Sequence, residues 1–292
     1  MRSLKVEHTT IYRYSKPVTF GQHRMMLRPR DSHDLRVTAS RLRITPQPTA
    51  VRWLHDLFEN SVAVASFPCS AQELRFESEI DVVHYDTNEP DCPVEPYAET
   101  YPFTYSADEI PDLNRSIERH YSDPEHQVDA WAKRFVEGGS QTFALLTAMT
   151  QAIKQEGFKY APRDAEGCQK PTETLALKSG TCRDFALLMI EAVRALGLAA
   201  RFVSGYIYVP SADHAGNVGG GATHAWVQVY LPGSGWMEFD PTNGIVGNRD
   251  LIRVAVARDP SQALPISGSW TGNPTDFLGM EVDVKVTSAV SQ

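Results

Sequence analysis

A cysteine in the second half of the chain has the surroundings that nucleophilic catalysis needs. Cys182 stands one residue after Thr181 and two before Asp184. This spacing of Thr181 and Asp184 is that of a capping box, so Cys182 should be the first residue of a helix. The unpaired N–H groups and the dipole at a helix start favour an anion, and this environment lowers the pKa of a cysteine. The pattern therefore predicts a thiolate nucleophile at Cys182.

The helix that follows has one apolar stripe, and Cys182 lies at its edge. The cysteine should therefore face whatever the helix covers. Taken alone, Cys182 would be interpreted as packed core, because free cysteine is among the most buried residue types. We interpret Cys69 and Cys92 in that way, and Cys168 as a loop residue. The stripe is formed by Phe185, Ala186, Met189, Ile190, Val193 and Leu196.

A base and its partner are predicted on a β-hairpin. Residues 223–231 and 236–240 alternate in polarity around a proline and glycine turn. Alternation puts His224 and Asp240 on one face. Two registers match the apolar faces: Asp240 lies either opposite His224, or opposite Trp226 with His224 on the diagonal. Either register lets the carboxylate orient the imidazole as a general base.

The alternative for any single histidine on a strand is a structural role. We give that interpretation to His8, His23, His33, His55, His84, His120, His126 and His214. His214 is the nearest rival of His224, but it lies in the glycine-rich loop 213–222. We interpret this loop as controlling access to the site.

The elements around these residues predict an α+β fold. Residues 1–105 read as an antiparallel β-sandwich, with strands at 5–14, 36–44, 61–67 and 74–83. The proline-rich segment 87–111 reads as an irregular crossing between the two domains. Residues 106–292 read as the catalytic domain, in which helices pack on an antiparallel sheet. Its helices are expected near 124–138, 141–156, 171–180 and 181–197, and its strands at 199–209, 223–231, 236–240 and 280–286.

Composition narrows the class of protein. The formal charge of −8 over 292 residues argues against a nucleic-acid partner, because binding phosphates needs a basic face. No stretch approaches the ~20 apolar residues that span a membrane, and no secretory signal is visible, so we expect a cytoplasmic protein without a membrane partner. The four cysteines lack metal-site spacing; we expect them reduced, with neither metal nor cofactor.

Several runs of the sequence resemble a known family. The second half resembles the transglutaminase-like core of bacterial proteins, which belongs to the papain-like superfamily, and the first half resembles the β-rich domain that precedes this core in one bacterial subgroup. Glu59 stands where that domain is expected to have glycine. The runs that carry the resemblance are 180–186, 200–206, 224–227 and 235–242, and, in the first half, 12–14, 17–18, 27–30, Pro46 and 56–60.

This resemblance implies Cys182 as nucleophile, His224 as general base and acid, and Asp240 as the residue that orients His224. The backbone N–H of Cys182 would donate to the oxyanion. The tryptophan that supplies a second donor in animal transglutaminases has no clear counterpart here. The resemblance thus implies an enzyme that opens amide bonds of a peptide or protein through a thioester.

Three functions stay open on these residues. If water resolves the thioester, the enzyme is a peptidase or amidase, which is the function we prefer. If an amine resolves the thioester, the enzyme is a transglutaminase. A non-catalytic binding module is the alternative from another class. The residues do not indicate an oligomeric state.

Overall fold

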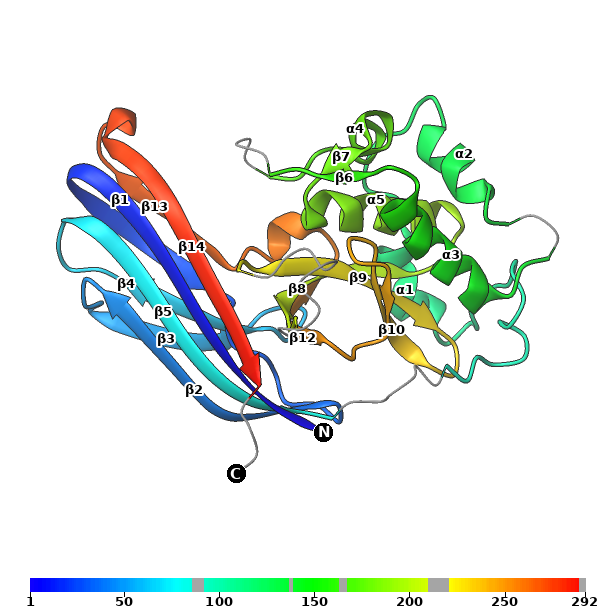
Figure 1. The fold of residues 1–292 in the computed structure, drawn as a ribbon, viewed down its shortest axis with the longest axis horizontal. Helices are drawn as coiled ribbons and strands as arrows, with labels where there is room; N and C mark the ends of the chain where they lie inside the picture. Colours follow the sequence, from blue (N-terminus) through cyan, green and yellow to red (C-terminus); the bar gives the residue numbers. More distant parts are fainter. Residues whose placement is uncertain (86–91, 137–138, 163–166, 210–220, 289–292) are drawn as a thin grey trace.

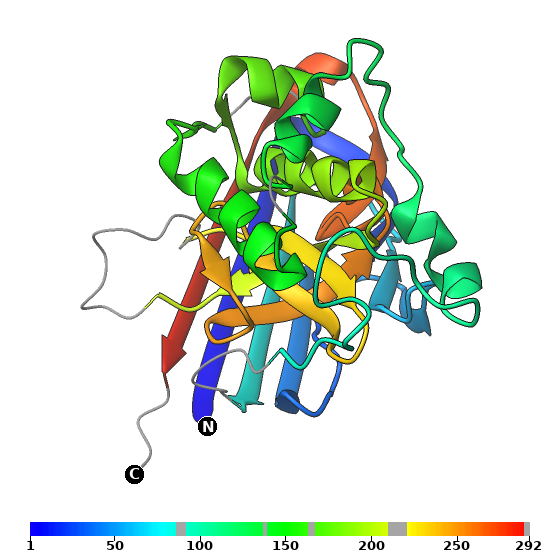
Figure 2. The same cartoon turned by 90° about the vertical axis from the view of Figure 1, so that its right-hand side faces the viewer.

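The computed structural model describes residues 1–85, 92–136, 139–162, 167–209 and 221–288. The chain forms a curled antiparallel sheet and a mixed body in which helices cover a second sheet (Figure 1). Figure 2 shows the helices in front and the long strands of the curled sheet behind them. The predicted α+β fold class is confirmed.

Strand β1 (Arg2–Met25) is the spine of the curled sheet. Alternate residues from Leu4 to Thr10 are buried, as the period of two in a strand requires. The sheet has the order β2 (Leu35–Thr45), β5 (Ala71–His84), β1, β4 (Ser61–Ser66), β3 (Ala50–His55). One core cluster of this sheet is formed by apolar side chains of β1, β4 and β5, among them Phe20, Met25, Ala63, Leu74 and Phe76. The edge strand β3 was not predicted, because its side chains are almost all exposed and leave no one-sided pattern.

The chain returns to this sheet at its far end. Strands β13 (Ile266–Thr271) and β14 (Phe277–Ser288) both pair with β1, and β14 lies along it over most of its length (Figure 1). The sequence places residues 106–292 together in the catalytic domain, whereas these two strands belong to the first sheet. The boundary at residue 105 stays a prediction. Two short 3-10 helices, Pro260–Gln262 and Pro274–Asp276, flank β13.

The second body is built on a five-stranded sheet. Its order is β11 (Ile245–Val246), β10 (Gly235–Asp240), β9 (His224–Leu231), β8 (Ala200–Ile207), β12 (Leu251–Ala257). The predicted hairpin is β9–β10. The helices are α1 (Ile110–Ile117), α2 (Gln127–Lys133), α3 (Thr142–Gln155), α4 (Pro171–Leu177) and α5 (Cys182–Ala195). Helix α1 was not predicted, because prolines mark its start as irregular chain. A two-stranded parallel ribbon joins β6 (Lys159–Tyr160) to β7 (Ser179–Gly180).

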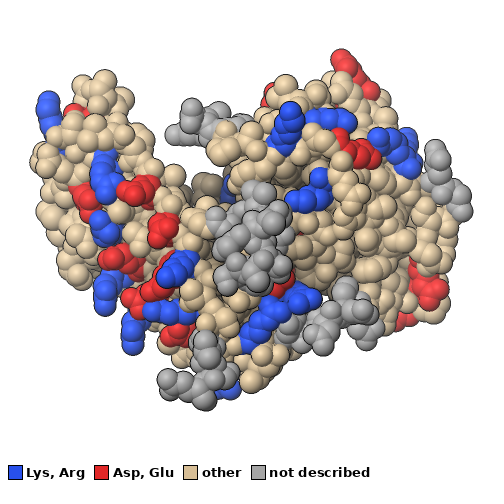
Figure 3. Space-filling model, in the orientation of Figure 1, with Lys and Arg blue, Asp and Glu red and all other residues tan. Residues whose placement is uncertain are grey.

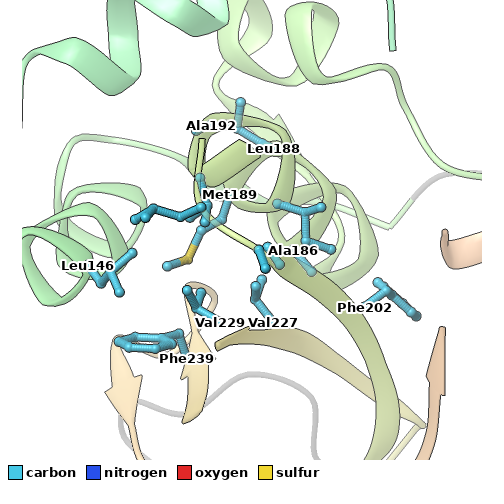
Figure 4. Packing of buried hydrophobic residues seen from close by; sticks show 14 of the residues in the cluster. Leu146, Ala186, Leu188, Met189, Ala192, Phe202, Val227, Val229 and Phe239 are labelled. Atoms are coloured by element: carbon cyan, nitrogen blue, oxygen red, sulfur yellow. The ribbon is translucent and has the colours of Figure 1, made fainter. Parts of the chain in front are cut away.

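Helix α5 is the central helix of this body. Every residue from Asp184 to Arg194 is buried, so the helix has packing partners all round. Ala186 and Met189 face Val227, Val229 and Phe239 of the hairpin (Figure 4). Burial on this scale fixes the position of the helix start, where Cys182 stands.

Charged side chains of both signs alternate along the outside of the curled sheet (Figure 3). They form exposed ion pairs such as Lys5–Glu7 and Arg13–Glu281. Pairs of this kind each contribute little stability. Among the described helices, none has the length and apolar content needed to cross a membrane.

Candidate active site

The start of α5 is held by a buried carboxylate. Asp184 accepts hydrogen bonds from the backbone N–H of Thr181 (2.7 Å), the hydroxyl of Thr181 (2.9 Å) and the backbone N–H of Gln169 (2.6 Å). Gly180 is needed here, because a Cβ at this position would lie 2.8 Å from the Cβ of Asp184. The predicted helix start is confirmed, and Cys182 is its first residue with a side chain only 5% exposed.

The hairpin brings His224 and Asp240 together. Gln228 lies opposite Glu238 and Val227 opposite Phe239, which is the second of the two predicted registers. Asp240 is therefore diagonal to His224. The imidazole Nε2 and the carboxylate Oδ2 are 2.7 Å apart, and both side chains are buried. A buried pair at this distance can orient the ring and stabilise its protonated form.

The turn after β10 fixes the carboxylate of Asp240. Its Oδ1 accepts from the backbone N–H of Thr242 at 2.9 Å, and its Oδ2 accepts from Nδ2 of Asn243 at 2.8 Å. Nδ2 of Asn243 also lies 3.4 Å from Nε2 of His224. Asn243 was not predicted from the sequence. The turn composition of residues 240–244 was the signal that could have indicated it, because aspartate at a turn commonly binds backbone N–H groups a few positions on.

The protonation of His224 is set by opposing effects. Burial lowers the pKa of the ring, but the charge and hydrogen bond of Asp240, followed by Cys182, outweigh burial and raise the pKa to about 10. The other ring nitrogen, Nδ1, is buried and makes no hydrogen bond within the described residues. Asp240 and Cys182 are thus the two groups that favour the charged ring.

A second polar network contacts the imidazole of His224 through Trp226. The indole of Trp226 stacks on His224, with centroids 5.9 Å apart. Its Nε1 donates to Glu238, which also accepts from Gln228 and Arg253, each at 2.6 Å. Trp226 is fully buried, so it belongs to the core and not to a substrate cleft. This network was not predicted from the sequence.

Tyr206, Tyr208 and Trp236 differ in their surroundings. Tyr206 is buried and shares a hydrogen bond of 2.9 Å with His8, so both are structural. Tyr208 and Trp236 are half-buried. Trp236 lines a cavity of about 770 Å³ together with residues such as Arg30 of the loop between β1 and β2. Cys182 and His224 are not among its lining residues.

Two predictions about other residues have different outcomes. Cys69 was interpreted as buried, but it is exposed, because it lies in the loop between β4 and β5. His214 and most of the predicted access loop lie outside the described residues. Cys182, His224 and Asp240 are the predicted site residues, and the structure gathers all three at one place.

Comparison with known families agrees with both halves of the chain. Residues 4–83 match the bacterial transglutaminase-like N-terminal region, and residues 129–241 match the transglutaminase-like superfamily. The second match contains Cys182, His224 and Asp240.

Individual proteins and solved structures are also similar to this chain. An uncharacterised protein of Mycobacterium leprae is 25% identical over 284 residues, 97% of this chain and 99% of its own length. A protein-glutamine gamma-glutamyltransferase of Pseudomonas aeruginosa is 33% identical over 125 residues, 41% of this chain and 19% of that protein. The crystal structure of a candidate cysteine protease from Cytophaga hutchinsonii has a TM-score of 0.73 at 18% identity, covering 100% of this chain and 92% of that one. This last likeness shows that the whole fold is shared.

Proposed function

The chain belongs to the transglutaminase-like proteins, and from this premise we propose that it is a cysteine-dependent enzyme that opens amide bonds of peptides or proteins. One observation carries the proposal. His224 is bound on one side by the buried carboxylate of Asp240, and Cys182 at the start of α5 acts on the same ring. This is the order that covalent acyl transfer needs: Cys182 as nucleophile, His224 as base and Asp240 as the residue that orients the base.

The proposed reaction has two halves. The sulfur of Cys182 attacks the amide carbonyl carbon, and the carbonyl electron pair moves to the oxygen. This oxygen accepts a hydrogen bond from the backbone N–H of Cys182. The C–N bond then breaks, and protonated His224 gives its proton to the leaving nitrogen. A thioester on Cys182 and a neutral imidazole remain. In the second half His224 takes a proton from the incoming nucleophile, which displaces the sulfur.

We propose water as the usual nucleophile, which makes the protein a peptidase or amidase. The shared fold with the Cytophaga hutchinsonii protein is in keeping with this choice. The second candidate is transamidation, in which an amine displaces the sulfur. The relative from Pseudomonas aeruginosa favours it, because that protein is named a glutamyltransferase and its similarity spans part of the core.

The two reactions are separated by their products. The protein is incubated with a glutamine-containing peptide and a labelled primary amine, and ammonia, hydrolysed peptide and amine adduct are quantified over time. Hydrolysed peptide in excess over adduct supports our proposal. Adduct in excess replaces it by transamidation. The Cys182→Ala variant is the control, because it removes the sulfur.

A non-catalytic module with the same fold makes a different prediction. If His224 stabilises a thiolate at Cys182, iodoacetamide at mildly acidic pH should modify Cys182 faster than the exposed Cys69. The variant His224→Ala should remove this preference. Faster labelling of Cys69 in the unmodified protein would favour the binding module.

A further inference from the structure

A tyrosine outside the predicted triad lies beside the sulfur. In the parallel ribbon, Tyr160 of β6 is level with Gly180 of β7, two residues before Cys182. The backbone N–H of Lys159 donates to the carbonyl of Lys178 at 2.8 Å, and that of Ala161 donates to Gly180 at 2.9 Å. The position of Tyr160 along the chain is therefore tied to the start of α5.

The direction of the tyrosine follows from the same ribbon. Residues that are level in neighbouring parallel strands project from the same face. A side chain at Gly180 would point at the first turn of α5, because its Cβ would lie 2.8 Å from the Cβ of Asp184. Tyr160 projects from that same face, toward the turn that contains Cys182. Tyr160 is 37% exposed, whereas Cys182 is 5% exposed, so Tyr160 is the more accessible of the two residues to solvent.

The electrostatics of the hydroxyl agree with this placement. Burial, followed by the charge of Cys182 and a hydrogen bond with it, raises the pKa of Tyr160 to about 12. The phenol therefore keeps its proton at neutral pH. It can act there only as a neutral donor, and the sulfur is the group that it reaches.

We propose that Tyr160 is a further catalytic residue that supplies the second donor of the oxyanion site, a role that rests on the proposed attack by Cys182. As the C–S bond forms, the carbonyl electron pair moves to the oxygen. That oxygen then accepts hydrogen bonds from the backbone N–H of Cys182 and from the hydroxyl of Tyr160. Tyr160 keeps its proton throughout, and collapse of the adduct returns the electron pair to the carbonyl.

The test compares two reactions of one sulfur. Acylation by p-nitrophenyl acetate passes through an oxyanion, whereas alkylation by iodoacetamide does not. Both rates are measured at Cys182 by peptide mass spectrometry, at a pH where the alkylation rate no longer rises. In Tyr160→Phe, acylation should fall about 10²–10³-fold, as for loss of one oxyanion donor, while alkylation hardly changes. The matched control is Tyr97→Phe, because Tyr97 is similarly exposed and binds Glu109.

Each outcome decides the role of Tyr160. An equal fall in both reactions would make it a support of the thiol alone and overturn the proposal, as would no fall in either. The activated ester needs no amide-bond activity. Failure of the protein to open any amide therefore counts against the proposed function, whereas the ratio of the two rates still judges Tyr160.

Discussion

Replacing Asp240 by asparagine isolates the charge that acts on His224. The side chain keeps its size and its hydrogen-bonding oxygen, and the turn residues Thr242 and Asn243 remain. The pKa of His224 is about 10, against an ordinary value of 6.5. At ~1.4 kcal/mol per pKa unit, this corresponds to roughly 5 kcal/mol in favour of the charged ring.

Without the carboxylate, burial lowers the pKa of His224 and only Cys182 opposes that effect. We therefore expect the pKa of His224 in Asp240→Asn to fall well below 10. Amide-bond activity should fall by about 10²–10⁴, because the ring loses its proton before it can protonate the leaving nitrogen.

The assay is an NMR titration of the labelled imidazole in the parent protein and in Asp240→Asn. Asp81→Asn on the outside of β5 is the control and should leave the titration of His224 unchanged. A pKa that stays near 10 in Asp240→Asn would refute the reasoning, since Asp240 would then not be the main source of the shift.

Three further predictions concern stability and the helix start. Asp184→Ala leaves three donors without their acceptor and should lower the free energy of unfolding by about 2–4 kcal/mol in urea titrations, with Asp184→Asn less affected. Gly180→Ala should cost about 1–3 kcal/mol through the contact with Asp184, and Cys182 should be alkylated more slowly; an unchanged stability and rate would contradict the packing. Burial lowers the pKa of His8 to about 4, so only the unfolded chain takes up this proton between pH 6.5 and 4. The free energy of unfolding should therefore fall by up to ~3 kcal/mol as the pH drops over that range. Urea midpoints of His8→Gln, measured over the same pH range, should lack this part of the pH dependence.

The triad and its supports differ in how visible they are in the sequence. Capping chemistry and strand alternation are local, so the start of α5 and the shared face of His224 and Asp240 could be predicted from spacing. The choice between the two hairpin registers could not, because both match apolar to apolar. The structure selects the diagonal one.

Residues that reach the site from elsewhere left no local signal. Tyr160 lies in a two-residue strand, too short for an alternating pattern, and only its pairing with β7 brings it to Cys182. The return of β14 to β1 is a contact between the two ends of the chain. Its alternation indicated a strand but not a partner, since pairing depends on the whole fold.

The central claim is that Cys182 carries the acyl group, and a trapped intermediate tests it most directly. The protein is mixed with a glutamine-containing peptide, quenched in acid within the first turnover, and digested for mass spectrometry. We predict a thioester on the peptide that contains Cys182, and we predict that this thioester is absent in Cys182→Ala. Product formation without any adduct at Cys182, or undiminished in Cys182→Ala, would contradict the account.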